Sequence, residues 1–132
     1  KKYLKSNEIK KYFKKSNFFL VSLKNGKSLN KTIPGKFQTY LAYGKPILVS
    51  SNGTLSNLVE KEKIGFSNKP NDIKKMVKKM NYIKNLKENE KIKIYLSSKK
   101  VYQDLFDLDK IVNDLIKYIK YVNKKNVKKN LS

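Results

Sequence analysis

Two short apolar runs on either side of a helix-forming segment constrain the fold of this chain most strongly. Residues 18–23 (FFLVSL) and 46–50 (PILVS) have the composition of strands that are covered on both faces of a sheet. Between them lies a segment that predicts a helix, with Pro34 in its first turn and Gly44 at its end. The order of strand, helix and strand predicts a parallel βαβ unit.

The remaining sequence continues this alternation. We predict a short helix at 6–16 capped by Ser6, a helix at 53–63 and a third strand at 64–67. Two further helices are predicted at 70–86 and 108–122, with a polar helical stretch between them. Their apolar stripes consist of Ile73, Met76, Val77, Met80 and Ile83 in the first, and of Leu108, Ile111, Val112, Leu115, Ile119 and Val122 in the second.

These elements predict an α/β fold in which a partial parallel sheet has flanking helices and a long C-terminal helix follows. We expect one domain over residues 1–122 and a basic, flexible tail over residues 123–132. Three strands make a thin sheet and the first residue is not methionine, so we expect a fragment with further strands upstream. Ligands of open α/β sheets bind at the carboxyl ends of the strands, which places the loop 24–36 at the site.

The composition excludes several classes of site. The chain has no cysteine and no histidine, which removes disulfides, thiolate metal sites, the usual zinc ligand and the usual general base near neutral pH. No apolar run approaches the roughly 20 residues of a membrane span, and no signal peptide is visible. We therefore expect a cytoplasmic protein.

The formal net charge of +22 suggests an anionic partner. All 32 basic residues are lysine, however, whereas dedicated nucleic-acid readers favour arginine. The lysines also fall mostly on the outer faces of the predicted helices. We attribute most of the charge to compositional bias and solvated surface, and expect no specific nucleic-acid partner. Peripheral contact with an anionic membrane remains open.

Residues 32–36 (TIPGK) form a candidate diphosphate site at the start of the second predicted helix. Thr32 is a candidate cap, and Pro34 suits the first turn because it has no amide proton. Gly35 would let a ligand approach the backbone, the amides from Ile33 onward carry partial positive charge, and Lys36 adds a full charge. The alternative is an ordinary helix start with a solvated lysine, and spacing alone does not decide between the two.

Residues 16–73 resemble the carboxy-terminal half of a GT-B glycosyltransferase of the large retaining family 4, or group 1, type. The resemblance rests on an ordered series: an apolar strand ending in a small polar residue, IPGK, YLAYGKPIL, a turn with serine and glycine, and a helix ending in EKEKIGF. It implies a Rossmann-like domain that holds a nucleotide-diphosphate sugar, while a separate amino-terminal domain holds the acceptor.

The resemblance also implies roles for individual residues. Thr32 and the backbone after it would meet the donor diphosphate. Many members carry two glutamates eight positions apart, and we place these at Asn30 and Gln38. Gln38 can still contact the ribose, whereas Asn30 near the donor sugar cannot act as a carboxylate. No catalytic residue is assigned.

The implied reaction is a retaining, hexosyltransferase-like transfer to a growing surface glycan or a lipid-linked saccharide, with no metal and no other cofactor. Asp107 and Asp109 precede a helix far from the site, so we interpret them as turn and capping residues. A basic pair and a pocket for the base, which relatives carry on earlier strands, are not found here. We therefore expect the fragment alone to be inactive.

Two alternatives remain open at this stage. A basic nucleic-acid-binding α/β module would explain the charge and the 15 Tyr and Phe residues, although Phe18, Phe19 and Phe37 fall on core-like positions. Binding of random oligonucleotides that falls steeply with salt would favour it. A receiver-type regulatory domain would need an acidic pocket at the strand ends, and the sequence shows none.

Overall fold

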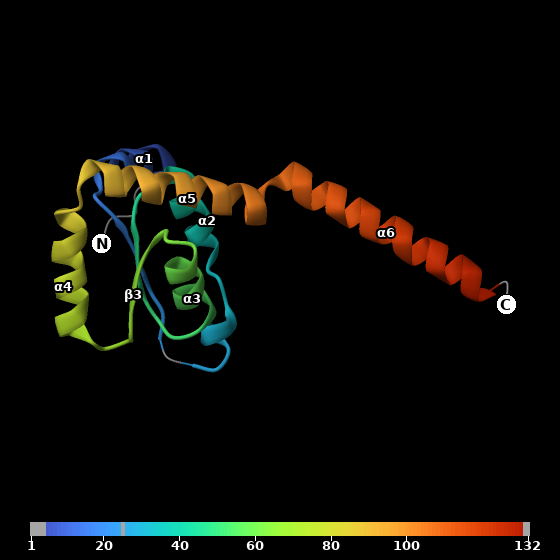
Figure 1. Cartoon of the computed structure of the whole chain (residues 1–132), viewed down its shortest axis with the longest axis horizontal. Helices are drawn as coiled ribbons and strands as arrows, with labels where there is room; N and C mark the ends of the chain where they lie inside the picture. Colours follow the sequence, from blue (N-terminus) through green and yellow to red (C-terminus); the bar gives the residue numbers. More distant parts are fainter. Residues whose placement is uncertain (1–4, 25, 131–132) are drawn as a thin grey trace.

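The computed structural model describes residues 5–24 and 26–130. They form an α/β fold with a small parallel sheet, flanking helices and a long C-terminal helix, as predicted (Figure 1). The elements are α1 (Ser6–Lys15), β1 (Phe19–Ser22), the 3-10 helix η1 (Leu29–Lys31), α2 (Gly35–Tyr43), β2 (Ile47–Ser50), α3 (Thr54–Lys61), β3 (Gly65–Asn68), α4 (Ile73–Lys84), α5 (Glu88–Phe106) and α6 (Leu108–Asn130).

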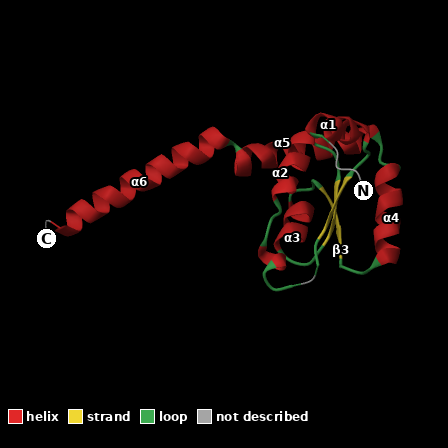
Figure 2. Cartoon of the chain, turned by 180° about the vertical axis from the view of Figure 1, so that it is seen from behind, coloured by secondary structure: helices red, strands yellow, loops and turns green. Residues whose placement is uncertain are grey.

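The sheet has the order β1-β2-β3, and both pairs of strands are parallel. Phe19 is paired with Ile47, and Ile47 with Gly65, so the three strands begin and end at the same edges. Figures 1 and 2 show α2 and α3 on one face of the sheet and α4 on the other. This arrangement explains why β1 and β2 are apolar without alternation.

Each face of the sheet has its own apolar cluster, because successive strand residues point to opposite sides. The cluster under α2, α3 and α5 consists of Val21, Phe37, Leu41, Ile47, Val49, Leu55, Val59, Ile64 and Val101. The cluster on the α4 side consists of Leu48, Ile83, Leu86 and Ile94, with Phe18, Leu20, Phe66, Met76 and Met80 packed against it. Phe19 and Phe37 are buried and Phe18 is partly buried, which confirms the core positions expected for these rings.

Both ends of α2 confirm a helix between the two strands. The helix ends at Gly44, which is left-handed (φ 67°) and donates its N–H to the carbonyls of Tyr40 and Leu41.

The prediction for the first helix was wrong in one detail. Lys5 occupies the cap position of α1 and Ser6 lies inside the helix, with the Lys5 N–H donating to Glu8 Oε2 at 2.8 Å.

The second half of the chain departs further from expectation. The stripe predicted for α4 is only partly buried: Ile83 is in the core, whereas Ile73 is 72 % exposed and Val77 is exposed. The polar stretch before α6 is helical, as predicted, and forms the 19-residue helix α5. The departure is that α5 packs on α2 and buries Ile94 and Val101.

Helix α6 extends away from the rest of the fold (Figures 1 and 2). It continues to Asn130, so no change of secondary structure marks the boundary predicted between residues 122 and 123; the flexibility of that tail stays a prediction. Among the described residues, no helix is both long enough and apolar enough to cross a membrane.

Candidate functional site

The carboxyl ends of β1 and β2 border a hollow of about 290 Å³. Parallel strands direct their carboxyl ends to one edge of the sheet, where open α/β folds bind ligands. Ser22 ends β1 and Ser50 ends β2, and the loop after β3 supplies the opposite wall. The lining residues are Ser22, Leu23, Lys24, Ser50, Pro70 and Asn71. Lys24, in the loop after the first strand, is one of the residues that border this hollow.

The segment from η1 to α2 follows the first strand across this edge. Thr32 closes η1: its Oγ1 donates to the Leu29 carbonyl at 2.9 Å, and its N–H donates to the same oxygen at 3.3 Å. The expectation that Thr32 caps the following helix was wrong, because Pro34 occupies the cap position of α2 with extended backbone. Proline at the cap leaves the helix without a side-chain acceptor for its first amides.

The first turn of α2 is open to solvent. Gly35 and Lys36 are exposed, and a Cβ built at Gly35 would meet no atom within 4 Å. The Phe37 N–H donates to the Pro34 carbonyl at 2.9 Å. The amides of Gly35 and Lys36 belong to the first turn of α2, where the helix offers no carbonyl to accept their hydrogen bonds. The backbone at this point is therefore accessible to an anionic group.

Lys36 also borders a second, mostly apolar hollow between α1 and α2, with a volume of about 430 Å³. Its other lining residues are Ile9, Lys10, Phe13, Thr39, Tyr40 and Tyr43. Lys36 is the one residue of the predicted diphosphate segment that borders this hollow, and no residue of the segment lines the hollow at the strand ends.

Gln38 and Asn30 differ in their surroundings. Gln38 is exposed on α2, whereas Asn30 is half-buried in η1. The Asn30 carbonyl lies against Gly53, the residue before α3, so closely that a Cβ at Gly53 would be 2.2 Å from the Asn30 oxygen. Gly53 holds φ at 97°, a conformation that other residues rarely adopt. This contact fixes the loop after β1 onto the loop after β2.

Two buried serines hold the turn between β2 and α3. Ser51 Oγ and Ser56 Oγ are 2.9 Å apart, and Ser56 Oγ donates to the Ser51 carbonyl at 2.7 Å. Both side chains are buried. The turn that carries Gly53 is therefore anchored from inside the fold as well as by its contact with η1.

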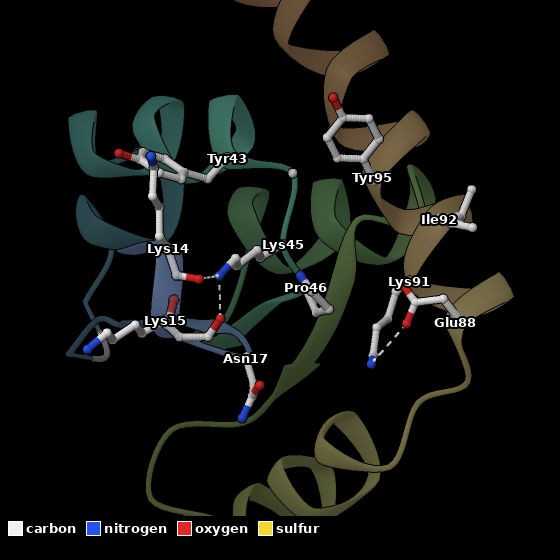
Figure 3. Close-up of a pocket in the computed structure, with 12 residues that line it drawn as sticks. Lys14, Lys15, Asn17, Tyr43, Lys45, Pro46, Glu88, Lys91, Ile92 and Tyr95 are labelled. Carbon is white, nitrogen blue, oxygen red and sulfur yellow. Dashed lines mark hydrogen bonds and ion pairs between the residues drawn. The ribbon is translucent and has the colours of Figure 1, made fainter. Parts of the chain in front are cut away.

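A third hollow, of about 430 Å³, lies at the opposite edge of the sheet, where β1 and β2 begin (Figure 3). Lys45 lines this hollow and makes three hydrogen bonds with its Nζ. It donates to the carbonyls of Phe13 at 2.8 Å, Lys14 at 2.6 Å and Ser16 at 2.5 Å. Burial lowers the pKa of Lys45 from its usual value. This lysine satisfies the carbonyls at the end of α1, which is a structural role.

Acidic residues have local roles in the described part of the chain. Asp107 Oδ1 accepts the Lys110 N–H at 3.0 Å at the start of α6, which confirms its predicted capping role. Asp72 does the same for Lys75 at the start of α4, and this backbone hydrogen bond is the main reason why the pKa of Asp72 is lowered. Within residues 5–24 and 26–130, no three acidic, histidine or cysteine side chains come together as metal ligands would.

Sequence reasoning did not single out most of the residues that line the hollow at the strand ends. Ser22 and Ser50 carried a signal, because each is a small polar residue at the end of an apolar run. Pro70 and Asn71 carried none, since only the fold brings the loop after β3 to the same edge.

Comparison with known proteins gives one match. The family model described as glycosyl transferases group 1 matches residues 1–100, a range that contains all three strands and the whole of α2. No curated protein and no solved structure matches the chain.

Proposed function

Because this chain belongs to the glycosyl transferases of group 1, we propose that it forms the donor side of an enzyme that transfers a sugar from a nucleotide-diphosphate sugar. The acceptor would be a growing surface glycan or a lipid-linked saccharide, held by a domain outside this chain. The family match over residues 1–100 is the observation that carries the proposal. It favours a transferase over a nucleic-acid-binding module.

The geometry supports a diphosphate site at the start of α2. Thr32 and Pro34 have extended backbone before the helix, and Gly35 and Lys36 lie in its exposed first turn. Two amides with unused donor capacity and one ammonium group would face the same anion. The open space at Gly35 allows a phosphate oxygen to reach the backbone.

These groups suit the chemistry of sugar transfer. As the bond to the sugar breaks, negative charge grows on the departing diphosphate. Fixed amides and a cation stabilise that charge more in the transition state than in the ground state, which accelerates the reaction. We propose that the transfer retains the configuration of the donor and needs no metal. Gln38 is proposed to contact the ribose, and Asn30 to lie near the donor sugar.

The proposal is tested by sugar transfer in the enzyme that carries this chain. Gly35→Val places a side chain in the space for the phosphate, and Lys36→Ala removes the cation. We expect each to lower kcat/KM by about a hundredfold, the lower end of the usual effect of losing one group that stabilises transition-state charge. Lys78→Ala is the matched control, because Lys78 is an exposed lysine on α4, across the sheet from α2.

Folding is monitored separately by circular dichroism, since both sites are exposed and their variants should melt like the wild type. Equal turnover in wild type, Gly35→Val and Lys36→Ala would refute the diphosphate site. For the ribose, Gln38→Ala is compared with Thr39→Ala, its neighbour on α2. A larger rise in the KM for the donor from Thr39→Ala would assign that contact to Thr39.

A further inference from the structure

Thr32 joins η1 to the start of α2, and its side chain turns back toward η1. Its Oγ1 donates to the Leu29 carbonyl at 2.9 Å, and its N–H donates to the same oxygen at 3.3 Å. The backbone of Thr32 is extended, with φ −99° and ψ 148°, so the chain leaves η1 at this residue. One carbonyl of η1 therefore accepts hydrogen bonds from both donors of Thr32.

This use of the hydroxyl decides what Thr32 can offer to an anion. A threonine hydroxyl carries one hydrogen and two lone pairs. Because the hydrogen is directed at Leu29, the side chain presents only lone pairs to a further partner, whereas a phosphate oxygen needs a donor. The groups of this segment that suit a diphosphate are the amides of Gly35 and Lys36 and the Lys36 ammonium group. Thr32 is instead suited to hold those amides in place.

The span from η1 to α2 is held at both ends. On one side, the Asn30 carbonyl lies against Gly53, and α3 contacts η1. On the other side, Phe37 is fully buried and its N–H donates to the Pro34 carbonyl at 2.9 Å. Thr32 lies between these two supports and is exposed, so burial does not fix its conformation. Its hydrogen bonds to η1 therefore set the direction in which the chain runs toward the first turn of α2.

We propose that Thr32 is a positioning residue for the start of α2: its hydroxyl orients the amides of Gly35 and Lys36 and does not contact the diphosphate itself. The link to sugar transfer rests on the proposed function, in which these two amides stabilise the departing diphosphate. Such stabilisation needs fixed geometry, and a misplacement of about 1 Å can lower a rate by about a hundredfold. The competing explanation is a direct contact between the Thr32 hydroxyl and the anion, for which the bond to Leu29 would have to break.

The test is nuclear magnetic resonance of the ¹⁵N-labelled full chain, first without a ligand and then with inorganic pyrophosphate. Thr32→Val keeps the branched shape and removes the hydroxyl, whereas Thr32→Ser keeps the hydroxyl. Thr39→Val is the matched control, because Thr39 is an exposed threonine within α2. Residual dipolar couplings report the orientation of each amide, and the couplings of the three strands monitor the fold in the same spectra.

Without a ligand, we expect Thr32→Val to change the couplings of Gly35 and Lys36, while Thr32→Ser and Thr39→Val keep the wild-type values. With pyrophosphate, Thr32→Val should bind about threefold to tenfold more weakly, the equivalent of one hydrogen bond, and Thr32→Ser should restore the affinity.

The outcomes separate this inference from the proposed function. Unchanged couplings in Thr32→Val would overturn the positioning role. If pyrophosphate binding nevertheless weakened in that variant, the hydroxyl would contact the anion directly. Changed couplings in Thr32→Val, together with a wild type that does not respond to pyrophosphate, would support the positioning role and refute the diphosphate site.

Discussion

Gly53→Ala should destabilise the chain because Gly53 is the contact between the loops that follow β1 and β2. Its backbone has φ 97° and ψ −145°, a region that is essentially restricted to glycine. An alanine Cβ would lie 2.2 Å from the Asn30 carbonyl oxygen and 3.0 Å from the carbonyl carbon. The obstruction is backbone, so the whole loop must move.

The expected loss follows from two contributions. Holding alanine in this conformation costs about 1–3 kcal/mol. Displacing the loop also disturbs the packing between η1 and α3, so we expect a total loss of about 3 kcal/mol in the free energy of unfolding. With a urea m-value of about 1.5 kcal/mol/M, the unfolding midpoint should fall by about 2 M. The assay is urea denaturation followed by far-ultraviolet circular dichroism.

Gly35→Ala is the matched control for this experiment. Gly35 is an exposed residue in the first turn of α2 and has open space at its Cβ position. Alanine is the better helix former, so the free energy of unfolding should rise by up to about 0.5 kcal/mol. The reasoning is refuted if Gly53→Ala unfolds at the same urea concentration as the wild type, or if both variants shift the midpoint in the same direction.

Two further changes test local contacts. Lys45→Met should lower the free energy of unfolding, because the carbonyls of Phe13, Lys14 and Ser16 lose their common donor. Solvent screens part of this interaction, so we expect a loss of about 1–2 kcal/mol. An unchanged midpoint in urea denaturation would contradict this. Asp72→Asn should leave stability near neutral pH almost unchanged, because asparagine also caps helices. The lowered pKa of Asp72 stabilises the fold above its usual value of 3.8, and this contribution is lost as the pH falls through the lowered value. Thermal melts should therefore show a smaller loss of stability in acid for the variant than for the wild type, and equal losses would contradict the role of Asp72.

The parallel sheet could be predicted because its signals are local. Each of the two apolar runs is a strand, and Pro34 and Gly44 mark the ends of the helix between them within a residue. The family resemblance was also visible in the sequence, because it depends on the order of these same elements. Thr32 was misassigned because a threonine before a helix can equally well close a preceding 3-10 turn, as it does here.

The second half of the chain was harder to predict because its helices contact residues far away in sequence. The core side of α5 contains Ile94, Ser98 and Val101, and the serine interrupts the apolar pattern. Ser98 is fully buried and its Oγ has no hydrogen-bond partner in the described part of the chain, so polarity was a poor guide to burial at this position. In α6 the periodicity correctly indicates a two-sided helix, but a periodic pattern does not identify what covers the apolar face.

The same limit applies to the candidate site. The residues of the segment 32–36 are consecutive, so the sequence alone was enough to group them. The hollow at the strand ends combines Ser22, Ser50 and Asn71 from three separate loops or strand ends, and its outline depends on the register of the sheet. The contact between Gly53 and Asn30 likewise requires the fold.

The most direct test of the central claim is a nuclear magnetic resonance titration of the ¹⁵N-labelled chain with uridine diphosphate and with inorganic pyrophosphate. Amide shifts report weak binding residue by residue, so they detect contact even if the chain alone is inactive. If the start of α2 holds the diphosphate, the largest shifts with both ligands will occur at Gly35 and Lys36, and Gly35→Val will abolish them. Largest shifts at Lys14, Lys45 and Lys91, around the hollow at the opposite edge of the sheet, would contradict the account.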